Sequence, residues 1–224
     1  MPNMDIIGSV KSSLTEPKKY LATLVNRKSL TEAYILYLIL SAITTIIYIP
    51  YLYLDYSQKF SEQSTVLAWV IGMTLFMVVY SLGGIFITIG IHHLFLKLFG
   101  AKGRFVDTFN SNIYSFITSF LFSIIYIIIF FFMKLAVPDI KTGALSSIIL
   151  YFSVFGILTL ITVGVLIYCW YLYCYALSLV HKISKGRAFV AALVIPTAIL
   201  TVLIIILVVL FILIFGMAIS SGLN

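Results

Sequence analysis

The chain has 224 residues, of which 62% are hydrophobic and only 9% are charged, and its mean hydropathy is +1.18. A soluble domain of this length needs more polar surface to cover its core, so the composition excludes a soluble fold and indicates a membrane protein. The formal net charge of +7 would suit a nucleic-acid partner. However, basic residues gathered in short loops beside apolar segments are explained by membrane insertion, so we expect no nucleic-acid partner.

The N-terminal segment, residues 1–30, differs in kind from the rest of the chain. Tyr20 and Leu21 belong to a short apolar stripe that lies opposite Lys18 and Lys19 at helical spacing. Amphipathic helices with basic faces tend to lie in the membrane interface. We therefore expect a short amphipathic helical segment, rich in basic residues, on the cytoplasmic surface.

Five long apolar stretches follow, each with at least the roughly 20 residues needed to cross the hydrocarbon core. Ser29, followed three residues later by Glu32, matches a capping box and predicts the start of the first helix. In the fifth stretch, Pro196 predicts a kink because it removes a helix hydrogen bond. The expected fold is an all-α polytopic helix bundle, with a membrane domain over residues 31–219 and an external tail over residues 220–224. The predicted spans cover residues 31–54, 66–96, 109–133, 147–180 and 188–219.

Basic residues fall overwhelmingly on one side of these spans, and this asymmetry predicts the orientation. Short cytoplasmic loops carry the excess of Lys and Arg, so the side with eleven of the 14 basic residues is expected to face the cytoplasm. The N-terminus is then inside and the C-terminus outside, which agrees with an odd number of spans. Nine of these residues are candidate contacts for anionic lipid headgroups or a protein partner: Lys18, Lys19, Arg27, Lys28, Lys102, Arg104, Lys182, Lys185 and Arg187.

The spans carry no motif for catalysis, for a cofactor or for a metal. The second to fifth spans hold no Asp, Glu, Lys or Arg, whereas ion-coupled transporters usually need such residues near the midplane. There is no nucleophile elbow, no zinc motif and no glycine-rich phosphate loop. We therefore expect a protein that is not an enzyme and that needs no cofactor and no metal.

One cluster of polar residues has two interpretations. Its members are His92, His93, Asn110, Asn112 and His181. They could form a proton site, a metal site or a polar groove near the inner leaflet. Alternatively, the histidines bond headgroups or helix ends, and the asparagines join packed helices. We favour the second interpretation, because His92 and His93 point about 100° apart on a helix and cannot easily bind one ion together.

The chain resembles the Yip family (Ypt-interacting proteins) in three segments that together span nearly its whole length. They are Leu14-Thr15-Glu16-Pro17 with Ser29-Leu30-Thr31-Glu32-Ala33, then His92-His93-Leu94 with Leu98-Phe99-Gly100-Ala101-Lys102-Gly103-Arg104-Phe105, and then Trp170 with His181-Lys182-Ile183-Ser184 and Arg187-Ala188. The resemblance implies a five-helix membrane protein. Eukaryotic members are tied to small GTPases of the Rab type, vesicle traffic and membrane shaping. The short N-terminal segment of this chain does not support GTPase binding and favours a prokaryotic, archaeal member in the cell membrane.

Our leading hypothesis is a non-enzymatic integral membrane protein of this family, which organises membrane or partner proteins through its helix bundle and basic cytoplasmic face. Glycine-bearing helix faces would also permit self-association. The alternative is a small-solute transporter or channel-like protein, with a polar path between two helix hairpins through Asn110, Asn112, Thr118 and the histidines. It draws on a faint repeat, Lys102-Gly103-Arg104 and Lys185-Gly186-Arg187, which follows the second and fourth spans.

Overall fold

A computed structural model describes residues 8, 11–12, 15–23, 29–136 and 145–221, with side chains between 134 and 152 and beyond 213 left out. The described residues form helices joined by short turns, and no strand occurs among them. Five helices are long and apolar enough to cross a membrane: Leu30–Ser57, Gln63–Leu98, Phe105–Met133, Ser153–His181 and Lys185–Leu213. The expected all-α bundle with five membrane helices is therefore confirmed.

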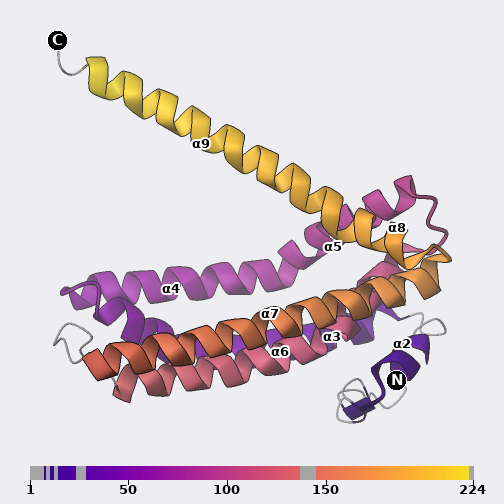
Figure 1. Cartoon of the computed structure of the whole chain (residues 1–224), viewed down its shortest axis with the longest axis horizontal. Coiled ribbons are helices and arrows are strands. Elements are labelled where there is room, and N and C mark those ends of the chain that lie inside the picture. The colour runs from indigo at the N-terminus through magenta and orange to yellow at the C-terminus, as the bar shows by residue number, and fades with distance from the viewer. Residues whose placement is uncertain (1–7, 9–10, 13–14, 24–28, 137–144, 222–224) are drawn as a thin grey trace.

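Three of these spans are single helices, and two are interrupted. The uninterrupted spans are α3 (Leu30–Ser57), α6 (Phe105–Ala136) and α7 (Leu145–His181). The second span consists of α4 (Gln63–Val79), the π-helical turn η2 (Tyr80–Gly84) and α5 (Ile85–Leu98). The fifth consists of α8 (Lys185–Phe189), the π-helical turn η4 (Val190–Val194) and α9 (Ile195–Ser221). Figure 1 shows α3, α6 and α7 packed side by side, whereas α9 leaves the bundle.

Short polar contacts set the start of several helices. The Ser29 hydroxyl accepts a hydrogen bond from the Glu32 N–H at 3.4 Å, so the first helix begins where the capping box predicted. The Ser184 hydroxyl caps α8 in the same way, accepting from the Arg187 N–H at 3.3 Å. In the first turn of α6, a carboxylate oxygen of Asp107 accepts from the backbone N–H just before the helix. These contacts are local, which is why sequence patterns reveal them.

The two π-helical turns differ in how clearly the sequence accounts for them. η4 ends two residues before Pro196, and this proline lacks the N–H that would otherwise bond the carbonyl of Ala192 within η4. The fifth helix is thus irregular where Pro196 predicted it. η2 was not predicted, and it contains Gly83 and Gly84 in an otherwise apolar helix. A Cβ on Gly84 would overlap the ring of Tyr80, whereas Gly83 faces open space.

The N-terminal helix α2 (Pro17–Thr23) packs on α6 and α7. Tyr20 and Leu21 are buried, and the Tyr20 ring meets the ring of Tyr114 edge-on at 5.6 Å. Lys18 and Lys19 remain exposed. The predicted amphipathic helix therefore exists, but Tyr20 and Leu21, the described part of its apolar stripe, are buried against the protein and not directed into lipid, because α6 and α7 offer aromatic and aliphatic partners at this level.

The second span is fastened to α3 at two separate levels. Near the turn that joins them, Leu52 packs with Val66 and Val70 in a small buried cluster. Further along, the Tyr34 hydroxyl donates a hydrogen bond to the carbonyl oxygen of Leu82 in η2 at 2.8 Å. These two attachments hold α4 and η2 along α3 and define the walls of a cavity described below.

The last helix, α9, makes little contact with the rest of the bundle. Every large apolar side chain from Ile199 to Leu213 is 45–63% exposed. A helix that is apolar on all sides and unburied is stable only where lipid takes the place of water. Together with the other four apolar spans, it marks the chain as a multi-pass integral membrane protein.

Candidate functional site

Two turns far apart in the sequence meet at one end of the bundle. The backbone N–H of Lys102 donates a hydrogen bond to the carbonyl oxygen of His181 at 3.1 Å. Beside it, Gly103 is buried under the His181 ring, where a Cβ would lie only 2.5 Å from Nδ1. The turn after α5 can therefore approach the end of α7 only because residue 103 has no side chain. This meeting point is called the turn junction.

A threonine joins two histidines at the turn junction. The Thr108 hydroxyl oxygen lies 2.7 Å from Nδ1 of His93 and 2.9 Å from Nε2 of His181. The two imidazole rings are 5.8 Å apart between centroids, and both Thr108 and His181 are fully buried. Three membrane helices, α5, α6 and α7, are thus bonded to one another through a single hydroxyl group.

The donors and acceptors available to Thr108, His93 and His181 determine the tautomer of each imidazole ring. A threonine hydroxyl has one proton, so it donates to one ring nitrogen and accepts from the other. Nδ1 of His181 is buried without a hydrogen-bond partner among the described residues. An unpaired N–H is costly there, so the proton of His181 belongs on Nε2. His181 then donates to Thr108, and Thr108 donates to His93.

His92 takes part in a different contact, as the helical spacing predicted. Its Nδ1 lies 3.3 Å from the hydroxyl oxygen of Tyr173, and its ring meets the Trp170 ring at 6.0 Å between centroids. His93, the next residue, faces Thr108 instead. The three predicted histidines therefore divide into a pair, half-buried His93 and buried His181, and one separate buried member, His92.

The two predicted asparagines also differ from each other. Asn110 is 1% exposed, and its amide atoms have no hydrogen-bond partner among the described residues. Asn112 is half-buried and lines a cavity together with His92. The predicted polar cluster is thus spread over three places. Sequence reasoning did not identify Thr108 or Tyr173 as partners, since each meets its histidine only through the packing of separate helices.

Within the part of the chain that is described, no three His, Cys, Asp or Glu side chains come close enough to hold a metal ion. His93 and His181 share the Thr108 hydroxyl in one hydrogen-bond chain that joins α5, α6 and α7. The arrangement at the turn junction therefore supports a structural role, in which hydrogen bonds hold α5, α6 and α7 together.

Exposed basic side chains surround the turn junction. Lys185 Nζ lies 5.0 Å from the ring centre of Tyr175 and 6.0 Å from that of Tyr171, and Lys18 Nζ lies 5.5 Å from the same Tyr171 ring. Such cation–ring contacts gather the basic groups of α2 and α8 over the end of α7. We call the exposed set the basic face: Lys18, Lys19, Lys102, Arg104, Lys182, Lys185 and Arg187. The predicted Arg27 and Lys28 lie outside the described residues.

Acidic side chains neutralise only part of the basic face. Arg104 lies 3.5 Å from an oxygen of Asp107, and Lys19 lies 2.9 Å from Glu16, whose hydrogen bond raises the pKa of Lys19. The other basic groups have no acidic partner within 4.0 Å among the described residues. The face therefore keeps a net positive charge at neutral pH.

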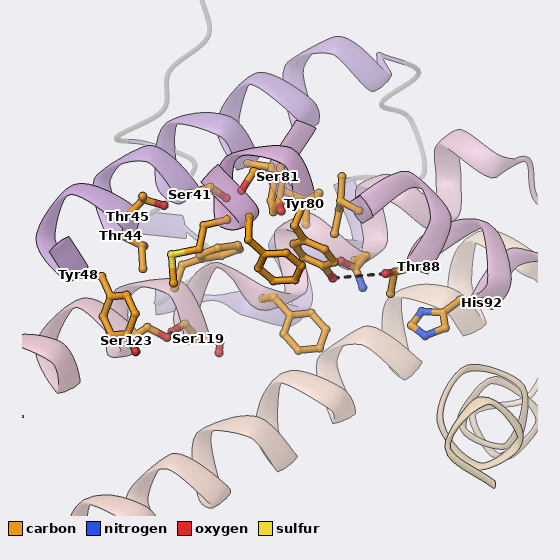
Figure 2. A pocket seen from close by; sticks show the side chains of 18 of the residues that line it. Ser41, Thr44, Thr45, Tyr48, Tyr80, Ser81, Thr88, His92, Ser119 and Ser123 are labelled. Carbon is orange, nitrogen blue, oxygen red and sulfur yellow. Dashed lines mark hydrogen bonds between the residues drawn. The ribbon is translucent and has the colours of Figure 1, made fainter. Parts of the chain in front are cut away.

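A cavity of about 450 Å³ lies between the second span, α3 and α6, with one wall from α7. Figure 2 shows hydroxyl side chains from several helices around it, including those of Thr44, Tyr80 and Ser123. The Tyr80 and Thr88 hydroxyl oxygens are 3.4 Å apart. No Asp, Glu, Lys or Arg occurs among its lining residues. Asn110 and Thr118, which the transport hypothesis placed on a polar path, do not line it.

Comparison with known proteins identifies the family. The family model for the Yip1 domain matches residues 11–207, which include α2, the first four membrane helices, most of the fifth, the turn junction and the cavity. No curated protein and no solved structure matches the chain. Because the family model covers most of the chain, this integral membrane protein belongs to the Yip1 domain family.

Proposed function

We propose that this protein is a non-enzymatic organiser of membranes, which binds anionic lipid headgroups through its basic face. The observation that carries the proposal is the convergence of exposed basic groups from α2, from the turn before α6 and from α8 onto one end of the bundle. Each exposed Lys or Arg near an anionic membrane surface contributes about 1 kcal/mol of attraction. The proposed orientation places this face in the cytoplasm, where the excess of basic residues is expected.

The rigid mounting of the basic face supports this role. Lys102 belongs to the turn whose backbone is bonded to His181, and Lys185 rests on the Tyr171 and Tyr175 rings. Basic groups held in place lose less conformational entropy when they bind than groups on a free tail. A flat headgroup layer, or a second membrane brought against the first, is the partner that such a surface would fit.

The test uses the full-length protein in phosphatidylcholine nanodiscs and vesicles with or without phosphatidylserine. Flotation should carry the protein upward only with the phosphatidylserine vesicles, and added salt should reduce the effect because it screens charge. Replacing Lys102, Arg104, Lys185 and Arg187 together by Gln should weaken binding by more than about tenfold.

The control variant is Lys59→Gln, which removes a positive charge at the opposite end of the bundle, where Lys59 is 2.6 Å from Asp55. Its flotation should equal that of the unchanged protein. If the fourfold variant still floats as well, while its thermal unfolding is unaltered, the basic face does not bind anionic lipid and the proposal is wrong.

The cavity favours a second candidate function, passage of a small uncharged solute. Asn112 and His92 both line it and supply polar groups within the membrane-spanning region. Flux of a solute in proteoliposomes that disappears in Asn112→Leu would support this function. Absence of flux over a broad panel of uncharged solutes would exclude it.

A further inference from the structure

We propose that the cavity between α3, α6 and the second span is a binding site for an uncharged lipid that carries a free hydroxyl group, such as a diacylglycerol. This inference is independent of the basic face, because the two sites share no residue. The ligand would enter the cavity from the membrane.

The charge of the lining selects an uncharged ligand. None of the 19 lining residues is Asp, Glu, Lys or Arg. Burying an ion in a membrane protein without a partner of opposite charge costs several kcal/mol. A phosphate, an ammonium group or a metal ion would therefore find no compensating charge here.

Three hydroxyl groups of the lining donate their protons to carbonyl oxygens of the protein's own helices. Thr44 donates to the carbonyl oxygen of Leu40 at 2.8 Å, and Ser123 donates to that of Ser119 at 2.8 Å. Thr88 likewise donates to the carbonyl oxygen of Gly84 at 3.1 Å.

Since a hydroxyl has one proton and two acceptor lone pairs, these three oxygens can still accept hydrogen bonds but cannot donate another. It also follows that Tyr80 is the donor in its contact with Thr88, so the Tyr80 oxygen too is left as an acceptor. Acceptors of this kind are satisfied by a ligand that supplies O–H donors.

The size and location of the cavity favour a lipid. Its volume of about 450 Å³ lies within the range of roughly 300–1,000 Å³ that is typical of small-molecule sites. Its α3 wall, from Tyr37 to Tyr48, lies in the middle of a membrane-spanning helix. Phe76 and Tyr80, which also line it, are 64% and 43% exposed, so the cavity is open at the α4 side. At this depth, that opening faces lipid acyl chains.

Two neighbouring glycines provide a matched pair of variants. A Cβ on Gly84 would overlap the Tyr80 ring and force it to move, which would alter one wall of the cavity. A Cβ on Gly83, one residue earlier in the same π-helical turn, meets nothing within 4 Å. Gly84→Ala should therefore change the site, and Gly83→Ala should leave it intact.

The experiment uses the full-length protein in nanodiscs that contain a diacylglycerol with a photoreactive group in one acyl chain. Illumination should label peptides from residues 37–48 and 112–123, and excess unlabelled diacylglycerol should abolish the labelling. Phosphatidic acid with the same acyl chains should compete poorly, because its phosphate is charged. Gly84→Ala should lower labelling at least about fivefold, roughly the effect of one lost hydrogen bond, and Gly83→Ala should not.

A second variant, Thr44→Val combined with Ser123→Ala, removes two acceptor oxygens with little change of shape and should lower labelling by a similar factor. The proposal is overturned if labelling cannot be saturated, if phosphatidic acid competes equally well, or if the Gly84→Ala and double variants both label like the unchanged protein. A fall in all three variants together with lost thermal stability would show a general packing effect and would also count against a specific site.

Discussion

The two Lys-Gly-Arg turns of this chain have the same three residues but are built differently. Gly103 is buried under His181, and the backbone beside it is bonded to the end of α7. Gly186 lies in the first turn of α8, is exposed, and would meet nothing within 4 Å if it carried a Cβ. Both turns present exposed basic side chains, but only the glycine of the first turn is packed against another helix. A repeated sequence therefore does not show a repeated structure, because the helix that packs above the glycine decides its role.

The largest expected contrast comes from the glycines themselves. Gly103→Ala should lower the free energy of unfolding by about 1–3 kcal/mol, because the new methyl group must displace the His181 ring. Gly186→Ala should raise it by about 0.5–1 kcal/mol, since alanine is the better residue in an exposed helical turn. SDS titration of the protein in detergent micelles, followed by circular dichroism, measures both values. Equal effects of the two substitutions would show that the turns are equivalent after all.

The next contrast is between the contributions to stability of two hydroxyl side chains, Thr108 beside the first turn and Ser184 before the second. Thr108→Val keeps the shape of the side chain but removes the hydroxyl that His93 and His181 share, so it should cost about 2 kcal/mol. Ser184→Ala removes the N-cap of α8 and should cost about 1 kcal/mol.

The same SDS titration compares these two variants, with Thr108→Ser as the control that restores a hydroxyl. A Thr108→Val protein as stable as the Thr108→Ser protein would mean that the shared hydrogen bonds contribute no net stability.

The smallest contrast concerns the arginines. Arg187→Gln should reduce flotation with phosphatidylserine vesicles several-fold, in line with about 1 kcal/mol for one basic group near an anionic surface. Arg104→Gln should reduce it less, because Asp107 already offsets part of the Arg104 charge at 3.5 Å. Asp107→Asn provides the check, since it should bring the effect of Arg104→Gln closer to that of Arg187→Gln.

The features that were predicted correctly from the sequence are those determined by residues close together in the chain. The five apolar spans, the cap at Ser29 and the irregular helix before Pro196 each follow from residues within a few positions of one another. The separation of His92 from His93 was also predictable, because it follows from the geometry of one helix.

The remaining features depend on contacts between distant segments. Thr108 lies between His93 and His181 only because α5, α6 and α7 converge, and no local pattern distinguishes it from the other threonines. The burial of the α2 stripe depends likewise on Tyr114 in α6. The serines, threonines and tyrosines that line the cavity form no sequence motif, and they come together only because four membrane spans pack around one space. The π-helical turn at Gly84 also had no clear signal, since glycines in an apolar helix commonly serve packing alone.

Because the two cysteines are buried, the reactivity of their thiols can be used to measure the separation of helices. Cys169 and Cys174, the only thiols in the sequence, are 0% and 5% exposed and both belong to α7. A maleimide dye can react with them only after α7 has parted from its neighbours. The rate of labelling in native membranes therefore reports how often the bundle opens, and a cysteine introduced at the exposed position of Gly186 in α8 would provide a fast-reacting reference in the same molecule.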